Sequence, residues 1–123
     1  MGYASDTIAV RSPLRRVLVT GPSMAPALRH GDQLLVDVRA VRRPLRAGDV
    51  VVVRLAERPL SVKRIARIES DGALWLEGDN SFGSTDSRDL GAVSSDAVFG
   101  RVVLRLWPRP GRIPDASPSS AAD

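Results

Sequence analysis

The chain has 123 residues, 43% of them hydrophobic and 26% charged, which is enough for one domain with an ordinary core. It contains no cysteine, and this excludes disulfides, thiolate catalysis and zinc–thiolate sites. A formal charge of +4 would suit a nucleic-acid binder, but aromatic residues make up only 4% of the chain, too few for a surface on which bases stack. We therefore expect no nucleic-acid partner.

Neither a membrane span nor a secretion signal is expected. Even the best apolar run, Val50 to Val53, ends at Arg54, far short of the roughly 18 residues that cross a bilayer. The N-terminal segment mixes Arg15 and Arg16 with apolar residues and has no apolar stretch of signal-peptide length. We expect a cytoplasmic protein without a membrane anchor of its own.

The first two predicted strands enclose a turn. Residues 15–20 alternate as a strand does and run into a Gly-Pro turn signal that ends strand pairing. Residues 24–29 suit one short helical turn, and residues 33–38 are typical of a second strand. Ser23 is therefore predicted to lie just past a strand end.

The next predicted strands form hairpins. After a basic loop at residues 39–48, strands at residues 49–55 and 60–68 are separated by a Glu-Arg-Pro turn. An Asp-Gly dipeptide precedes another strand at residues 73–77, so a second hairpin follows. Lys63 lies inside the strand at residues 60–68, where a side chain is held rigidly.

A long polar segment at residues 78–91 precedes the last predicted strand at residues 98–106. Loops of this length within a small domain are usually functional or disordered. Gly100, inside the last strand, indicates a bulge or a close approach of two backbones. The whole pattern predicts a mainly β fold, a small, mostly antiparallel and partly closed core with little helix. The predicted division of the chain is a flexible N-terminal segment (1–14), one folded domain (15–107) and a disordered Pro- and Ser-rich tail (108–123).

Arginine is strongly preferred among the basic residues: 17 are arginine, and one, Lys63, is lysine. A guanidinium stays protonated in proteins, whereas a buried ammonium can lose its proton. A position that keeps lysine against this bias is a candidate for a general base. Chance also yields a lone lysine, so the neighbouring motifs must decide between the two interpretations.

Three short motifs follow one another along the chain: Ser-Met-Ala-Pro at residues 23–26, Lys-Arg at residues 63–64 and Gly-Asp-Asn at residues 78–80. A Ser-Thr-Asp-Ser-Arg extension follows at residues 84–88. Each motif alone is weak, but together they resemble, in order and residue type, the signal-peptidase family of serine proteases. The resemblance covers about residues 17–107 and implies a serine endopeptidase with that family's β catalytic core.

The resemblance implies that Ser23 is the nucleophile and Lys63 the general base. A free hydroxyl is a poor nucleophile at neutral pH, so an adjacent base must take its proton. A lysine base must itself be neutral, and burial can lower its pKa from the ordinary value of about 10.4. His30 is a rival base, but it lies at a turn position that the family leaves variable, where a solvated side chain is the simpler interpretation.

The resemblance also assigns supporting roles around these two residues. Ser84 matches a hydroxyl that orients the lysine, and the backbone N–H of Ser23 is the expected oxyanion donor. Some relatives place a second hydroxyl donor where this chain has Gly21, so a backbone group, water or Thr20 would take its place. The residues expected to form and brace the loop are Asp79, Asn80, Asp86 and Arg88, and those expected to pack the motif are Met24 and Pro26.

Within the family, the chain resembles the soluble maturation protease of nickel-type superoxide dismutase in size, in lacking an anchor and in the segments Gly100 to Val103 and Leu106 to Pro108. This implies removal of an N-terminal leader from a precursor bound as an extended peptide, with no cofactor and no metal ion. The alternatives are a signal peptidase whose anchor a partner supplies, which would cleave exported preproteins, and a non-enzymatic binding module. A self-cleaving repressor uses similar chemistry but needs an upstream DNA-binding domain, and only about twenty residues precede Ser23.

Overall fold

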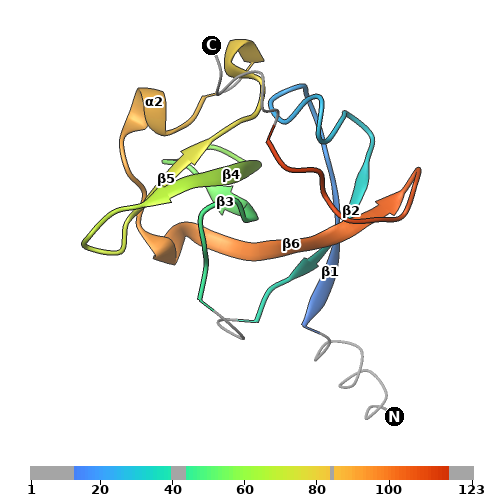
Figure 1. Ribbon diagram of the computed structural model, residues 1–123, viewed down its shortest axis with the longest axis horizontal. Coiled ribbons are helices and arrows are strands. Elements are labelled where there is room, and N and C mark those ends of the chain that lie inside the picture. The colour runs from blue at the N-terminus through green and yellow to red at the C-terminus, as the bar shows by residue number, and fades with distance from the viewer. Residues whose placement is uncertain (1–12, 40–43, 84, 117–123) are drawn as a thin grey trace.

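One antiparallel sheet forms the framework of the protein, and the computed structural model describes residues 13–39, 44–83 and 85–116 of it. The strand order is β1-β2-β6-β3-β4-β5 (Figure 1), which leaves β1 and β5 at the edges of an open sheet. The predicted mainly antiparallel β fold with little helix is confirmed. The strands are β1 (Leu14–Leu18), β2 (Gln33–Asp37), β3 (Val50–Arg54), β4 (Leu60–Ile68), β5 (Leu74–Glu77) and β6 (Val98–Trp107), and the helical turns are η1 (Ser81–Gly83), α2 (Ser87–Leu90) and η2 (Ser95–Ala97).

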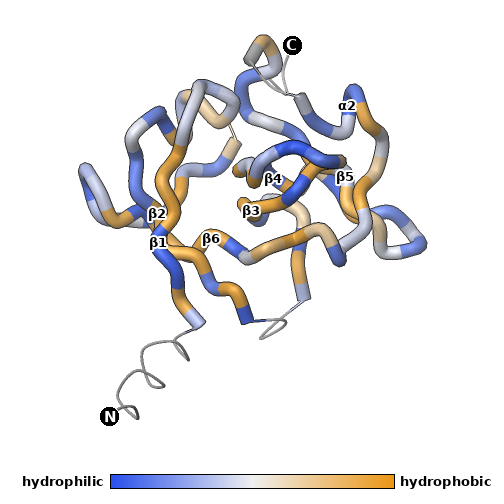
Figure 2. Tube along the Cα trace, turned by 180° about the vertical axis from the view of Figure 1, so that it is seen from behind, coloured by the Kyte–Doolittle hydropathy of each residue, from blue (hydrophilic) through white to orange (hydrophobic). Residues whose placement is uncertain are grey.

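β3 is buried on both of its faces. Val50 and Val52 belong to one hydrophobic cluster, while Val51 and Val53 belong to a second. Successive side chains of a strand point to opposite sides, so a run of four valines suits a strand covered on both faces. Figure 2 shows hydrophobic colouring along β3. The first cluster also contains Val19, Met24, Leu28, Leu34, Val36 and Val102, and the second contains Leu55, Ile65, Leu74 and Leu76.

β6 joins the two halves of the sheet. Its residues Arg101 to Trp107 pair with β2, and its residues Val98 to Arg101 pair with β3. Gly100 lies where the strand passes from one partner to the other, and a Cβ there would lie 2.6 Å from the Val36 side chain and 2.8 Å from the Asp37 carbonyl oxygen. The close backbone approach expected at Gly100 is present.

The predicted division of the chain at residues 14 and 107 stays a prediction. β1 begins at Leu14. Beyond the end of β6, Gly111 pairs with Arg105, and Ile113 packs against the first hydrophobic cluster. The described part of the C-terminal segment therefore contacts both the sheet and the core.

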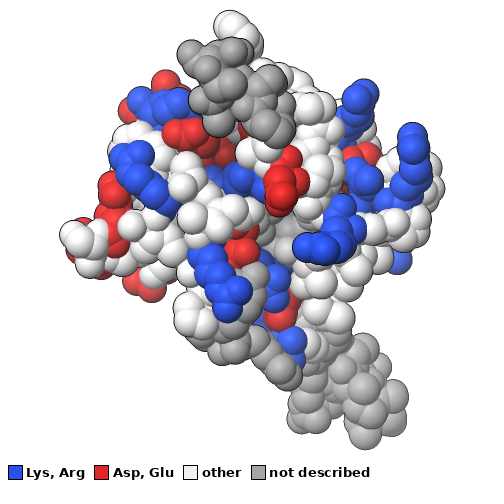
Figure 3. All heavy atoms as spheres, viewed as in Figure 1, with Lys and Arg blue, Asp and Glu red and all other residues white. Residues whose placement is uncertain are grey.

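The surface mixes charges of both signs. Figure 3 shows basic and acidic side chains interspersed over one face of the molecule. Ion pairs such as Arg67 with Glu69 and Arg39 with Asp37 neutralise part of the positive charge locally. Within residues 13–39, 44–83 and 85–116, no helix has the length and hydrophobicity needed to cross a bilayer.

Replacing Gly100 by alanine should lower the free energy of unfolding by about 1 to 3 kcal/mol, because the added methyl group has to push β2 and β6 apart. Urea unfolding at equilibrium would measure the change. Gly111→Ala is the matched control, since nothing lies within 4 Å of the position that its Cβ would take. Equal stability of the two variants would contradict a close approach at Gly100.

Candidate active site

Ser23 lies in a tight segment that connects β1 to β2. A backbone hydrogen bond from the Val19 N–H to the Asp32 carbonyl (2.8 Å) closes the base of this segment. Within it, the Leu28 N–H donates to the Met24 carbonyl at 3.0 Å, which forms a single turn. Both of these side chains are buried in the first hydrophobic cluster. The apolar face of the turn therefore anchors the residues around Ser23 to the core.

Lys63 is buried within β4, opposite Val51 of β3, with only 3% of its surface exposed. Burial is the main reason that the Lys63 pKa is lowered, because an ammonium ion inside the protein loses its hydration. The charge of Asp86 acts in the opposite direction, whereas Arg88 and Arg58 lower the pKa further. The amine is thereby biased toward the neutral form that a general base requires.

Ser23 and Lys63 line the same cavity, which has a volume of about 290 Å³. The segment after β1 forms one side of this cavity, and the turn between β3 and β4 forms another. Thr85, which belongs to the polar loop, lines a third side. The structure therefore brings together the two residues that the motifs single out from positions 40 residues apart. The cavity is lined by Thr20, Gly21, Pro22, Ser23, Arg58, Pro59, Leu60, Ser61, Lys63 and Thr85.

Asn80 connects the Gly-Asp-Asn motif to the segment that carries Ser23. Its backbone N–H donates to the Ser23 carbonyl at 2.8 Å, and its side-chain Nδ2 donates to the Pro22 carbonyl at 3.2 Å. The Asn80 Oδ1 accepts from the Phe82 N–H at 3.1 Å. Asn80 therefore holds the Ser23 segment from the side of the polar loop.

Asp79 forms a bidentate ion pair with Arg64 of β4, at 3.0 Å from Nε and 2.9 Å from Nη2, and both side chains are more than 90% buried. Arg64 also donates to the carbonyls of Gly48 (3.1 Å) and Pro114 (2.8 Å). The motif predicted a place for Asp79 in the loop but did not indicate its partner. The alternation of side chains along a strand was the signal that could have indicated this partner, because it places Arg64 on the face of β4 opposite to Lys63.

Asp86 and Arg88, two of the residues expected to brace the loop, form an ion pair with Nη2 to Oδ2 at 2.6 Å and Nε to Oδ1 at 3.0 Å. Asp86 is fully buried, caps the start of α2 and accepts a hydrogen bond from the Gly78 N–H at 2.8 Å. Arg88 donates to the Gly78 carbonyl at 3.1 Å. These contacts fix the distance between the start of the polar loop and α2, because the geometry of such a pair is rigid.

The remaining predicted site residues lie in different places. The Gly21 N–H donates to Nδ1 of His30 at 3.0 Å, a contact that the sequence analysis missed. His30 is not among the residues that line the cavity of Ser23 and Lys63, whereas Thr20 is. Pro26, which was expected to pack the motif, is exposed. Ser84 lies outside the described residues.

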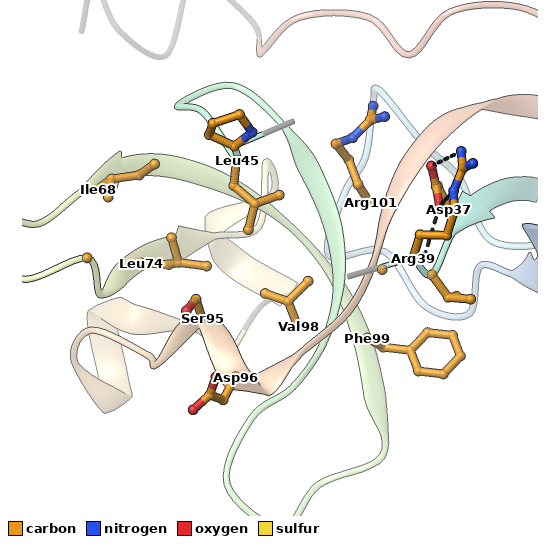
Figure 4. A pocket seen from close by; sticks show the side chains of 14 residues that line it. Asp37, Arg39, Leu45, Ile68, Leu74, Ser95, Asp96, Val98, Phe99 and Arg101 are labelled. Atoms are coloured by element: carbon orange, nitrogen blue, oxygen red, sulfur yellow. Dashed lines mark hydrogen bonds and ion pairs between the residues drawn. The ribbon is translucent and has the colours of Figure 1, made fainter. Parts of the chain in front are cut away.

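A larger cavity, with a volume of about 550 Å³, lies elsewhere and contains neither Ser23 nor Lys63. Leu45, Leu74 and Val98 point into it, and Asp37 and Arg39 form an ion pair at its border (Figure 4). The hydrogen bonds from Arg39 lower the Asp37 pKa to about 2. This cavity is mostly apolar, and its lining contains no lysine.

The chain matches the Peptidase S24-like family over residues 3–103. It belongs to this family. It is 36% identical over 115 residues to mitochondrial inner membrane protease subunit 1 of Xenopus tropicalis, covering 75% of this chain and 68% of that protein. It is 32% identical over 120 residues to subunit 2 of the same protease in Schizosaccharomyces pombe, covering 77% and 67%. The Arabidopsis thaliana ATP-independent inner membrane protease subunit 1a is 35% identical over 115 residues, covering 73% and 68%.

Membership of the Peptidase S24-like family makes this chain a serine-type peptidase, and it confirms the resemblance to signal peptidases at the level of the family. The expected cytoplasmic location is wrong, because the relatives are proteases of the mitochondrial inner membrane. The expectation failed because it relied on the lack of an apolar span in this chain. A protease can also reach a membrane through a partner or through its surface.

Replacing Asp79 by alanine should lower the free energy of unfolding by about 3 to 5 kcal/mol, because the Arg64 guanidinium would stay buried without its carboxylate. Urea unfolding of both proteins would measure the loss. Glu69→Ala is the control, since it breaks a largely exposed pair with Arg67, which contributes at most about 1 kcal/mol. A loss no larger than that of the control would contradict a structural role for the buried pair.

Proposed function

We propose that this chain is an endopeptidase that removes an N-terminal leader from a precursor protein, with Ser23 as nucleophile and Lys63 as general base. The observation that carries the proposal is that the two side chains line one cavity while burial lowers the Lys63 pKa. The neutral amine takes the proton of Ser23 Oγ as the oxygen bonds to the scissile carbonyl carbon. The N–H of Ser23 stabilises the resulting oxyanion.

The second half of the reaction uses the same two residues. Lys63 gives its proton to the leaving amine, and the remaining acyl group stays bound to Ser23 as an ester. Lys63 then takes a proton from a water molecule, which attacks the ester and releases the acid product. The serine regains its proton from Lys63, so the enzyme returns to its starting state without a cofactor.

An extended substrate would bind along the first part of β4. Residues Leu60 to Lys63 pair with β3 on one side, but the pairing of β4 with β5 begins at Arg64. The other edge of this part of β4 therefore lies beside the cavity without a neighbouring strand among the described residues. A peptide added there gains backbone hydrogen bonds without needing a particular sequence.

Two observations bear on the substrate. The segments Gly100 to Val103 and Leu106 to Pro108 resemble the maturation protease of nickel-type superoxide dismutase. This resemblance supports the precursor of that dismutase as the substrate. The named relatives act at the mitochondrial inner membrane, which supports a membrane-associated location and an exported precursor. Both candidate substrates would lose an N-terminal leader, so we propose leader removal as the activity. The experiment below uses both precursors.

Wild-type protein should shorten a precursor by its leader, whereas Ser23→Ala and Lys63→Ala should leave it intact. Mass spectrometry of the nickel superoxide dismutase precursor and of an exported preprotein, each incubated with the three proteins, would measure this. Ser61→Ala is the control, because it changes a cavity hydroxyl with no role in the proton transfer and should keep most activity.

The Ser23→Ala variant also tests substrate docking. Bound precursor should slow hydrogen exchange at the backbone amides of Ser61 and Val62 and leave the amides of β1 unchanged. Cleavage of neither precursor by wild type would contradict leader removal. Cleavage by the Lys63→Ala variant would contradict the proposed base.

Activity should rise with pH as Lys63 loses its proton, because the neutral amine is the active form. Burial lowers the Lys63 pKa, so the midpoint of the pH profile of kcat/KM should lie below the ordinary value of about 10.4. Arg58→Gln removes a positive charge that lowers this pKa, and the midpoint should move to higher pH.

Arg67→Gln provides the matched control for Arg58, because Arg67 lies over the Trp75 ring and does not contribute to the Lys63 shift. Its midpoint should equal that of wild type. Salt should reduce the difference between the Arg58 variant and wild type, since an exposed charge is screened. A profile that is flat from about pH 6 to 10 would rule out a titrating lysine base.

A further inference from the structure

His30 completes the hydrogen bonding of the segment that carries Ser23. Its ring accepts a hydrogen bond at Nδ1 from the Gly21 backbone N–H, at 3.0 Å and across nine positions of the chain. Gly21 has a φ of +79°, so the chain leaves the β ladder there, just beyond the bond between the Val19 N–H and the Asp32 carbonyl. If β1 and β2 continued to pair here, a backbone carbonyl would accept the hydrogen bond from the Gly21 N–H. The imidazole nitrogen of His30 accepts it instead.

His30 holds the Ser23 segment at Gly21, and Asn80 holds it at Pro22 and Ser23. Asn80 donates to the carbonyls of Pro22 (3.2 Å) and Ser23 (2.8 Å). Gly21 precedes Ser23 by only two residues, and both line the catalytic cavity. A rotation of the Gly21 peptide therefore displaces the backbone that presents the Ser23 hydroxyl and N–H.

This contact depends on the protonation state of the imidazole. A neutral ring has one acceptor nitrogen, whereas both nitrogens of an imidazolium are donors. Asp32, two residues after His30, accepts a hydrogen bond from the Arg29 N–H at 2.9 Å and lies 3.7 Å from the Arg105 guanidinium.

We propose that His30 is a positioning residue for the nucleophile: the neutral ring fixes Gly21 and with it the backbone of Ser23, and the protonated ring releases both. The inference rests on the proposed serine–lysine mechanism and adds to it a second titratable group. Lys63 acts inside the cavity, while His30 acts through the segment that forms its wall.

Two substitutions at His30 separate positioning from general structure. His30→Asn keeps an acceptor oxygen at the same distance along the side chain but cannot titrate, whereas His30→Phe keeps a ring without an acceptor. His30→Phe should lower kcat for leader removal about two- to tenfold with KM nearly unchanged, the loss expected for one hydrogen bond. His30→Asn should restore the wild-type kcat.

Backbone amide NMR provides a readout that does not need activity. As the pH falls, the Gly21 amide resonance of wild type should move together with the titration of the His30 ring. The Gly21 resonance of the His30→Asn variant should stay constant over the same range. The Gly111 amide is the control in both proteins, because it donates to the Arg105 backbone carbonyl.

The outcomes separate this inference from the proposed function. A Gly21 resonance that does not follow the ring overturns the inference, whatever the activity. Wild-type kcat in His30→Phe, or an equal loss in both variants, overturns it as well and leaves the protease mechanism intact. Absence of cleavage by wild type overturns the proposed function itself, whereas the Gly21 resonance tests the His30 contact independently of activity.

Discussion

Burial of the Lys63 amine is the constraint on which the remaining structure depends. An ammonium ion removed from water is costly, so the protein lowers the Lys63 pKa and at the same time has to hold the side chain in place. β4 can do this because it is paired with β3, whose side chains are covered on both faces. Asp86 opposes the shift, but its bidentate contact with Arg88 satisfies that carboxylate within the loop.

Two consecutive residues of the polar loop connect the proposed base to the proposed nucleophile. Asp79 binds Arg64, which follows Lys63 in β4 and points to the other side of the strand. Asn80 binds the backbone of the Ser23 segment. The Gly-Asp-Asn motif therefore acts as a structural bridge, because Asp79 and Asn80 hold the two segments together through hydrogen bonds.

Much of the fold could be predicted from local patterns. Alternation located the strands within a few residues, and the run Val50 to Val53 became a strand with both faces buried. The partner of Asp79 and the acceptor of the Gly21 N–H could not be predicted, because both contacts join residues that the sheet brings together from different elements. The contact of Ile113 with the core could not be predicted either, because the Pro-rich composition of the C-terminal segment does not indicate which residues it packs against.

The sequence by itself determined the residue types of the site: one lysine among arginines, a serine after a predicted strand, and a polar loop too long to be a simple turn. Only the tertiary structure decided that Ser23 and Lys63 line one cavity, that Arg64 rather than a surface group neutralises Asp79, and that His30 lies outside that cavity. The physical reason is that residue chemistry is a local property. Burial and distance, which decide the protonation and reach of each group, arise only when distant strands pair.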